Sequence, residues 1–246
     1  MFARHLFTFC VILIANVAFA QESTPVVTHA PVSGLEPGIG FEHRKVIEEF
    51  TNLAQQGKLA EVDQACDEVI AAFQKLMTDP KATYLSFANK AEFEYYQKAN
   101  PKLGKVEWLD YAYGEALHYK TFVAAERKQY ADALEYSRVE IEYRPLATNA
   151  LTEQGFILNR LGRLQEGLES YEQAVKLAEQ FASNQSQHGV ALRGVGATLI
   201  DLGRLDEAKA AYEQSLKVEP NNKLALSELE YIRKLKEKEN SQPPKD

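Results

Sequence analysis

The sequence contains few cysteines, and this limits the covalent chemistry available to the chain. Of 246 residues, two are cysteines, and Cys10 lies in an apolar run near the N-terminus. Without that run Cys66 has no cysteine to pair with, which excludes an intramolecular disulfide. Cys66 lies in AEVDQACDEVIAAF, a pattern typical of an amphipathic helix, so we interpret it as a small core residue. A reactive or intermolecular thiol is the alternative.

Motifs for catalysis and metal binding are also lacking. The sequence has five histidines but no H-E-x-x-H, C-x-x-C or G-x-S-x-G, and no phosphate-binding loop. No histidines or cysteines have the spacing of a zinc site. The many Asp and Glu residues follow the polar faces of predicted helices. We therefore expect no enzymatic activity, no cofactor and no metal site.

The chain has no excess of positive charge. It has 35 acidic and 28 basic residues, a formal net charge of −7. Proteins that bind nucleic acid or anionic lipid surfaces need clustered Lys and Arg, and no such cluster is present here. We therefore exclude both classes of ligand and do not expect membrane insertion of the mature chain.

A hydrophobic run long enough to cross a membrane is absent too. The longest apolar run, Leu6–Val17, is about 12 residues, and a transmembrane helix needs about 20. It follows Arg4 and precedes Ala18-Phe19-Ala20, the arrangement of a secretory signal peptide. We predict a signal peptide over residues 1–20, cleaved after Ala20, and an exported, periplasmic protein. An uncleaved anchor and a eukaryotic secretory route are the alternatives.

Two segments lack hydrophobic periodicity. Residues 21–40 contain three prolines and three glycines, and we predict a flexible linker there. Residues 239–246 are polar and are predicted to form a disordered tail.

The sequence does contain an internal repeat. GFILNRLGRLQEGLESYEQAV begins at Gly155, and GATLIDLGRLDEAKAAYEQSL begins at Gly196, 41 residues later. Apolar residues recur every three or four positions on both sides of the LGR sequence. This spacing predicts two antiparallel helices joined by a glycine turn, each with one buried face.

These residues resemble the tetratricopeptide repeat family, whose pattern is W-x2-L-G-x2-Y, then A-x3-F, then P. The second copy matches this pattern closely at Leu192, Gly196, Leu199, Ala208, Tyr212 and Pro220. In the first copy, Gly167 takes the position of the small alanine, and no proline closes the repeat.

The resemblance implies an all-α fold, a right-handed α-solenoid of stacked antiparallel helix pairs. We expect three repeats, at residues 114–147, 148–188 and 189–222, and a capping helix at 223–238. The middle repeat is seven residues longer than the usual 34, and the surplus lies near Ala182–His188. Either both flanking helices are longer by about a turn, or this stretch is a loop.

Residues 41–113 are predicted to be a helical N-terminal region. Two amphipathic segments meet at Gly57, which predicts one degenerate hairpin of the same kind. Further helices are expected at about 82–98 and 106–127, and they are rich in aromatic residues. Aromatic side chains at helical spacing usually pack in a core.

In this family the first helix of each repeat lines a concave groove, so the resemblance predicts which residues contact a partner. They are His118 and Phe122 in the first repeat, Asn149, Thr152, Phe156, Asn159 and Arg160 in the second, and Val190, Arg193, Ala197 and Ile200 in the third. Arg160 and Arg193 would donate charged hydrogen bonds to an acidic group of a peptide. Alternatively, the two arginines pair with Glu153 and Asp201, and the groove binds nothing.

The carboxylate clamp of chaperone-binding relatives is not expected. That clamp uses Lys, Asn and Arg at fixed groove positions. Here the resemblance assigns these positions to His118, Phe122, Glu153, Val190 and Gly194. The sequence therefore favours a scaffold or adaptor that binds another protein or peptide. The alternative is a structural subunit that self-associates, as a homo-oligomer in a cell-envelope assembly, through the aromatic helices between Tyr84 and Phe122.

Overall fold

The computed structural model describes residues 37–87, 89–181 and 185–240. The chain divides into two compact units, Met1–Leu146 and Ala147–Asp246, and we describe each by itself. The predicted signal peptide, most of the predicted linker and residues 241–246 of the predicted tail lie outside the described residues.

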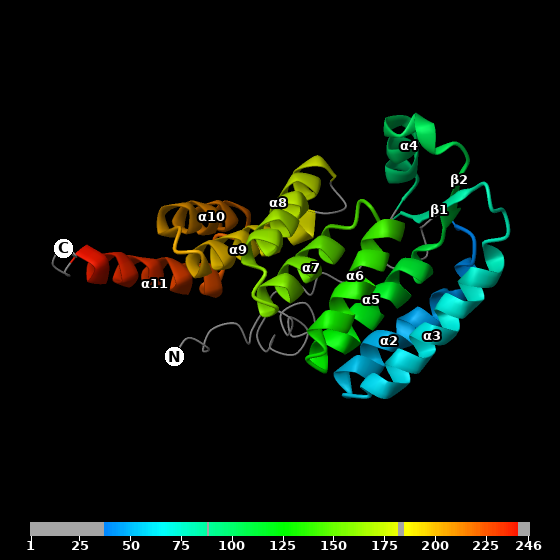
Figure 1. Cartoon of the computed structure of the whole chain (residues 1–246), viewed down its shortest axis with the longest axis horizontal. Coiled ribbons are helices and arrows are strands. Elements are labelled where there is room, and N and C mark those ends of the chain that lie inside the picture. Colours follow the sequence, from blue (N-terminus) through cyan, green and yellow to red (C-terminus); the bar gives the residue numbers. More distant parts are fainter. Residues whose placement is uncertain (1–36, 88, 182–184, 241–246) are drawn as a thin grey trace. The chain divides into compact units, whose positions relative to one another are not determined.

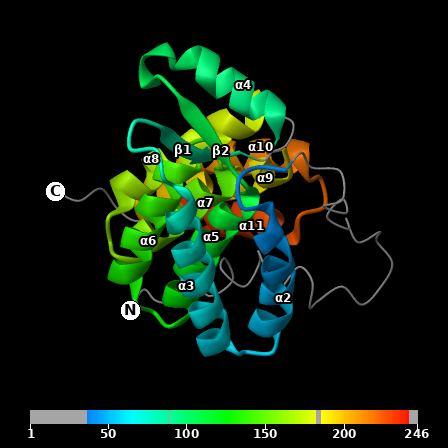
Figure 2. The same cartoon turned by 90° about the vertical axis from the view of Figure 1, so that its right-hand side faces the viewer.

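The first unit consists of helices and one small sheet. Figure 2 shows α2 (blue) and α3 (cyan) as an adjacent pair, and α5 packs against both of them and against α6. Its described residues include 3-10 turns at Phe41–His43 and Pro101–Leu103. The elements in chain order are α2 (Arg44–Gln55), α3 (Leu59–Leu76), β1 (Thr83–Ser86), α4 (Lys90–Ala99), β2 (Val106–Leu109), α5 (Tyr111–Glu126) and α6 (Tyr130–Tyr143).

The small sheet was not expected from the sequence. Strands β1 and β2 pair in parallel, with Leu85 opposite Trp108, so the helices predicted at 82–98 and 106–127 are wrong in their first residues. Two side-chain caps explain why the helices begin later. Asn89 accepts a hydrogen bond from the Glu92 amide at 3.0 Å, and Asp110 accepts one from the Ala112 amide at 3.2 Å.

Residues 37–40, which the sequence assigned to the linker, are part of the folded unit. The Ile39 amide donates to the Trp108 carbonyl at 3.0 Å, and the Asp110 amide donates to the Ile39 carbonyl at 2.9 Å. Asp110 is also paired with Arg44, at 2.6 Å between Nη2 and Oδ2. These contacts attach residues 37–40 and the start of α2 to the residues immediately before α5.

The core of the first unit is formed mainly by α2, α3 and α5. Cys66, Phe50 and Phe73 are completely buried in it. Burial also raises the pKa of the Cys66 thiol, so the interpretation of Cys66 as a core residue is confirmed. The aromatic residues around β2 pack on one another, with Phe93 stacked on Trp108 at 5.6 Å between ring centroids.

The second unit is a series of helices in which each packs against the next, as Figure 1 shows from α7 to α11. Its helices are α7 (Thr148–Arg160), α8 (Leu164–Gln180), α9 (Gln185–Asp201), α10 (Leu205–Val218) and α11 (Lys223–Asn240). Helix α7 also packs against α9, so these two alternate helices are neighbours. The predicted all-α fold of stacked helix pairs is confirmed, with the two-stranded sheet as an addition.

The seven additional residues of the middle repeat lengthen two helices. Helices α8 and α9 each have 17 residues, whereas α10 has 14 and α7 has 13. Of the two alternatives left open by the sequence, the structure therefore shows the longer helices. Residues 182–184 between them lie outside the described residues.

Glycines allow the repeats to stack closely around buried tyrosines. A Cβ at Gly155 would lie 2.8 Å from the Tyr171 ring, and a Cβ at Gly196 would lie 2.6 Å from the Tyr212 ring. Gly194, on the following repeat, also lies against the Tyr171 ring. The recurring Gly and Tyr of the sequence repeat are therefore one packing contact used twice.

Candidate functional site

Among the described residues, four pairs of helices are joined by turns with the same backbone conformation. Gly57, Gly162 and Gly203 have φ of 72°, 76° and 74°, and Lys128 has φ of 60°. In each case the next amide donates to a carbonyl five residues back, at 2.8–2.9 Å: Lys58 to Leu53, Gln129 to Ala124, Arg163 to Leu158 and Arg204 to Leu199. This is the left-handed C-terminal cap that ends many helices. It identifies the first helix of each pair as α2, α5, α7 and α9.

In the second unit, α7 and α9 are linked through candidate residue Asn159. Its Nδ2 donates a hydrogen bond to Thr198 Oγ1 at 2.7 Å, and the Thr198 hydroxyl donates to the Gly194 carbonyl at 2.8 Å. Asn159 is therefore part of the contact between successive first helices. Asn149 and Arg160, at the two ends of α7, are half-buried, as are Val190, Ala197 and Ile200 on α9.

Two other candidates on α7 contribute little surface. Thr152 is buried, and its hydroxyl donates to the Thr148 carbonyl at 2.7 Å. Phe156 is buried as well. Their side chains mainly support the face that Asn149 and Arg160 border.

Arg193 lies in the middle of α9, and its charge is compensated within the protein. The side chain is 4% exposed, and its Nη1 lies 2.9 Å from Glu219 Oε2. Asn222 also donates to Glu219, at 2.8 Å, and caps α11 by accepting the Ala225 amide at 3.0 Å. Asp201 was the internal partner expected as the alternative from the sequence, but the carboxylate that Arg193 contacts is Glu219.

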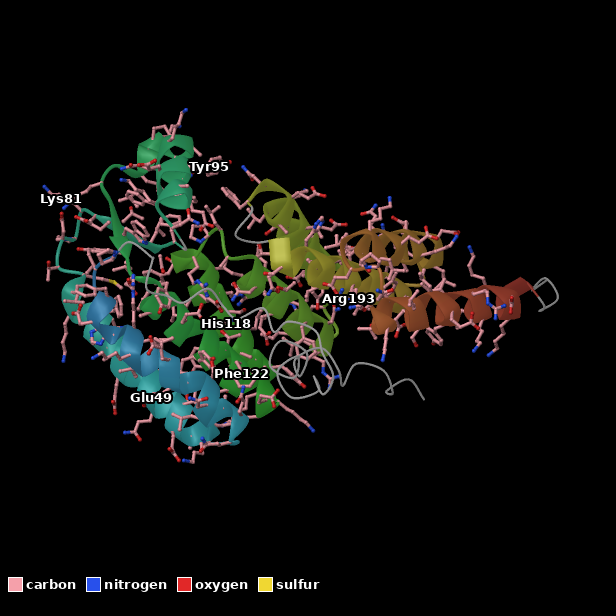
Figure 3. The ribbon with its side chains drawn as sticks, turned by 180° about the vertical axis from the view of Figure 1, so that it is seen from behind. Glu49, Lys81, Tyr95, His118, Phe122 and Arg193 are labelled. Atoms are coloured by element: carbon pink, nitrogen blue, oxygen red, sulfur yellow. The ribbon has the colours of Figure 1, made fainter. Side chains whose placement is uncertain are left out.

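In the first unit, His118 and Phe122 lie one turn apart on α5 (Figure 3). His118 Nδ1 is 3.1 Å from Oε1 of Glu140, a completely buried carboxylate on α6. Glu140 also accepts from Arg144 Nη1 at 2.9 Å, and Arg144 Nη2 is 3.1 Å from Glu115. His118 thus belongs to a polar cluster centred on Glu140, which was not expected from the sequence.

A second charged cluster was also missed. Lys120, on α5, is 2.6 Å from Asp63 and 2.9 Å from Asp67, both on α3. Arg127 also contacts Asp63 at 2.6 Å. Burial acts to raise the pKa of Asp63, but hydrogen bonds from Lys120 and Arg127 outweigh it, and the pKa is lowered. The signal for this cluster was Lys120 itself, a lysine where the repeat pattern expects leucine.

Metal-binding clusters and membrane-spanning helices were sought among the described residues. Within residues 37–87, 89–181 and 185–240, no group of three or more His, Cys, Asp or Glu could hold a metal ion. None of the helices in these ranges has the length and hydropathy required to cross a membrane.

Residues 146–219 match the tetratricopeptide repeat family. The matched range contains both copies of the repeated sequence and helices α7 to α10. This part of the chain is thereby assigned to the tetratricopeptide repeats.

A curated relative is Hsp70-Hsp90 organizing protein 2 from Arabidopsis thaliana, which is 26% identical over 134 residues. The match covers 54% of this chain but 23% of that protein, so the chain spans about a quarter of the relative's length.

Similar solved structures are also domains of tetratricopeptide repeats. The Sgt2 domain from Aspergillus fumigatus is 21% identical with a TM-score of 0.48, covering 54% of this chain and 86% of that one. The first such domain of human RPAP3 is 27% identical with a TM-score of 0.47, covering 52% and 97%. The second domain of human RPAP3, solved with the HSP70 peptide SGPTIEEVD, is 22% identical with a TM-score of 0.43, covering 48% and 92%.

Proposed function

We propose that this chain, whose residues 146–219 are tetratricopeptide repeats, is an exported, periplasmic scaffold that binds a protein or peptide and has no enzymatic activity. The observation that carries the proposal is the contact between α7 and α9. Two first helices lie side by side, and their half-buried polar and apolar residues form a continuous face, the α7–α9 face. Stacked helix pairs offer such faces to extended or helical segments of other proteins.

On the α7–α9 face, Asn149 can bond to peptide groups of the partner, and Arg160 can donate to an acidic group. Val190, Ala197 and Ile200 provide apolar contact next to them. Arg193 supports this face through Glu219 and does not offer an uncompensated charge. Export is proposed from the sequence of residues 1–20 alone.

A crosslinking pull-down from envelope extract tests the proposal. We expect the full chain to capture one partner in a fixed ratio, and Arg160→Glu to reduce the capture about tenfold by repelling an acidic group. Arg163→Glu is the matched control, because Arg163 is partly exposed and pairs with Glu166 at the start of α8. Circular dichroism is used to check that both variants are folded.

Two results would refute the proposal. A wild-type chain that captures nothing would exclude the scaffold role. Capture that is equal for the Arg160 and Arg163 variants would exclude the assignment of the α7–α9 face.

A further inference from the structure

The first helices of the first unit, α2 and α5, carry two rows of side chains with the same spacing. Residues at i, i+4, i+7 and i+11 lie along one side of a helix. Helices α2 and α5 also pack against each other. The rows are Arg44, Glu48, Thr51 and Gln55 on α2, and Tyr111, Glu115, His118 and Phe122 on α5.

Side-chain contacts between α2 and α5 hold the two rows next to each other. At one end, the Arg44 guanidinium lies 5.0 Å from the centroid of the Tyr111 ring. Further along, the Thr51 hydroxyl is 2.7 Å from the hydroxyl of Tyr119, the neighbour of His118. The two rows therefore form one surface, which we call the α2–α5 face.

The α2–α5 face contains aromatic rings that the core does not fully cover. His118, Tyr119 and Phe122 are half-buried, and the Tyr119 ring meets the rings of His118 and Phe122 edge-on, at 6.3 Å in both cases. Such rings offer apolar contact and negatively polarised faces to a cation.

The charges at this face are predominantly negative. Arg44 is compensated by Asp110, and Arg144 contacts both Glu115 and Glu140. Glu48 is exposed, Glu115 is half-buried, and the buried Glu140 lies between Arg144 and His118, so the carboxylates here outnumber the one guanidinium that contacts them. Lys120 on α5 and Arg127, the residue that follows α5, are paired with α3.

We propose that the α2–α5 face binds an extended basic segment of a partner protein, with Lys or Arg side chains alternating with apolar ones. Charge complementarity selects this occupant, because the cations would lie between Glu48 and Glu115. The apolar side chains would lie on Tyr119 and Phe122. This inference rests on the proposed binding function and names the chemistry of the partner for a second face.

Fluorescence anisotropy with the full chain tests this inference. The probe is a dye-labelled peptide of Lys-Leu-Pro repeats, and its counterpart has Glu in place of Lys. We expect the basic peptide to bind at least about tenfold more tightly, and its affinity to fall as salt is added.

Charge reversal on α2 gives a matched pair of variants. Glu48→Lys should weaken binding of the basic peptide about tenfold or more. Glu49→Lys should change it less than about twofold, because Glu49 lies about 100° further around α2. Figure 3 shows Glu49 on this helix, and both carboxylates are exposed, so neither variant disturbs the core.

Equal binding of the acidic and basic peptides, no binding of the basic peptide, or equal effects of the two variants would overturn the inference. Failure here is distinguishable from failure of the scaffold proposal. If the pull-down partner is retained by Glu48→Lys and lost by Arg160→Glu, the scaffold proposal stands and the α2–α5 assignment falls. A wild-type chain without any partner in the pull-down refutes the scaffold proposal, whatever the peptide does.

Discussion

The side-chain amide of Asn159 occupies the space that a Cβ on Gly167 would take. A Cβ there would also lie 3.0 Å from the Gly155 carbonyl oxygen. Gly167 is therefore needed where the repeat pattern has alanine, because Asn159 points across to Thr198 on α9. In the next repeat the corresponding residues are Ile200 and Ala208, and no such amide is present.

We therefore predict that Gly167→Ala lowers the free energy of unfolding by about 1–3 kcal/mol through overpacking. In an Asn159→Ala background the same change should raise the stability by about 1 kcal/mol, because alanine favours the helix over glycine. Urea unfolding of the four chains measures the coupling between the two positions. If the effects of the two substitutions on the free energy of unfolding are additive, Asn159 is not the reason why position 167 requires glycine.

The backbone conformation of the turn between α5 and α6 leads to a second prediction. Lys128 has φ of 60° at the position where the other three turns have glycine. Glycine adopts this conformation without the steric cost that a side chain imposes. Lys128→Gly should therefore raise the free energy of unfolding by about 1 kcal/mol, and Gly162→Ala should lower it by a similar amount.

Lys128→Ala is the control for loss of the lysine side chain, and thermal unfolding is the measurement. If the alanine variant gains as much stability as the glycine variant, backbone strain is not the cause.

These turns also show how much of the fold could be predicted from the sequence. The repeated LGR predicts the turns at Gly162 and Gly203, and the spacing of 34 residues places the earlier turn at Lys128 although no glycine marks it. Periodicity alone could not find β1 and β2. Short apolar runs with aromatic residues fit either a helix or a strand, and the helix starts depend on caps at Asn89 and Asp110.

The candidate site could be predicted only as positions on helices. Repeat register indicates that Asn149, Arg160 and Arg193 belong to first helices, but it does not show which charges are already paired. Glu219 lies 26 residues from Arg193, and Asp63 lies 57 residues from Lys120. Such pairs depend on how the helices stack, and a single sequence does not specify their side-chain geometry.

The pairing of Lys120 with Asp63 predicts a pH-dependent contribution to stability. The pKa of Asp63 is lowered in the folded protein, so its contribution is fully present above the unfolded pKa of about 3.9. It is lost as the pH falls through the lower pKa of the folded state. Lys120→Met should therefore destabilise the protein by about 2 kcal/mol at pH 7, and by much less near pH 3.

Urea unfolding at the two pH values measures this difference. Lys58→Met is the control, because Lys58 is exposed and its nearest carboxylate oxygen, on Glu61, is 3.8 Å away. If Lys120→Met lowers the free energy of unfolding by the same amount at both pH values, lost packing and not the charge pair is responsible.

The ion pair between the buried Arg193 and the partly exposed Glu219 predicts a coupling between α9 and the start of α11. Arg193→Ala leaves Glu219 without its guanidinium partner and removes an almost fully buried side chain, so it should cost about 3 kcal/mol. Because Glu219 also bonds to Asn222, which caps α11, the first amides of α11 should exchange faster with solvent. Asn222→Ala should increase the same exchange and cost about 1 kcal/mol through loss of the cap.

Hydrogen exchange with mass spectrometry, together with urea unfolding, checks both variants. Arg204→Ala is the control, since Arg204 makes a similar ion pair with Glu207 on the surface and should leave α11 unchanged. If Arg193→Ala weakens partner capture in proportion to the loosening of α11, Arg193 acts by holding the structure of the repeat. Loss of capture with α11 exchange unchanged would instead assign Arg193 a direct contact with the partner.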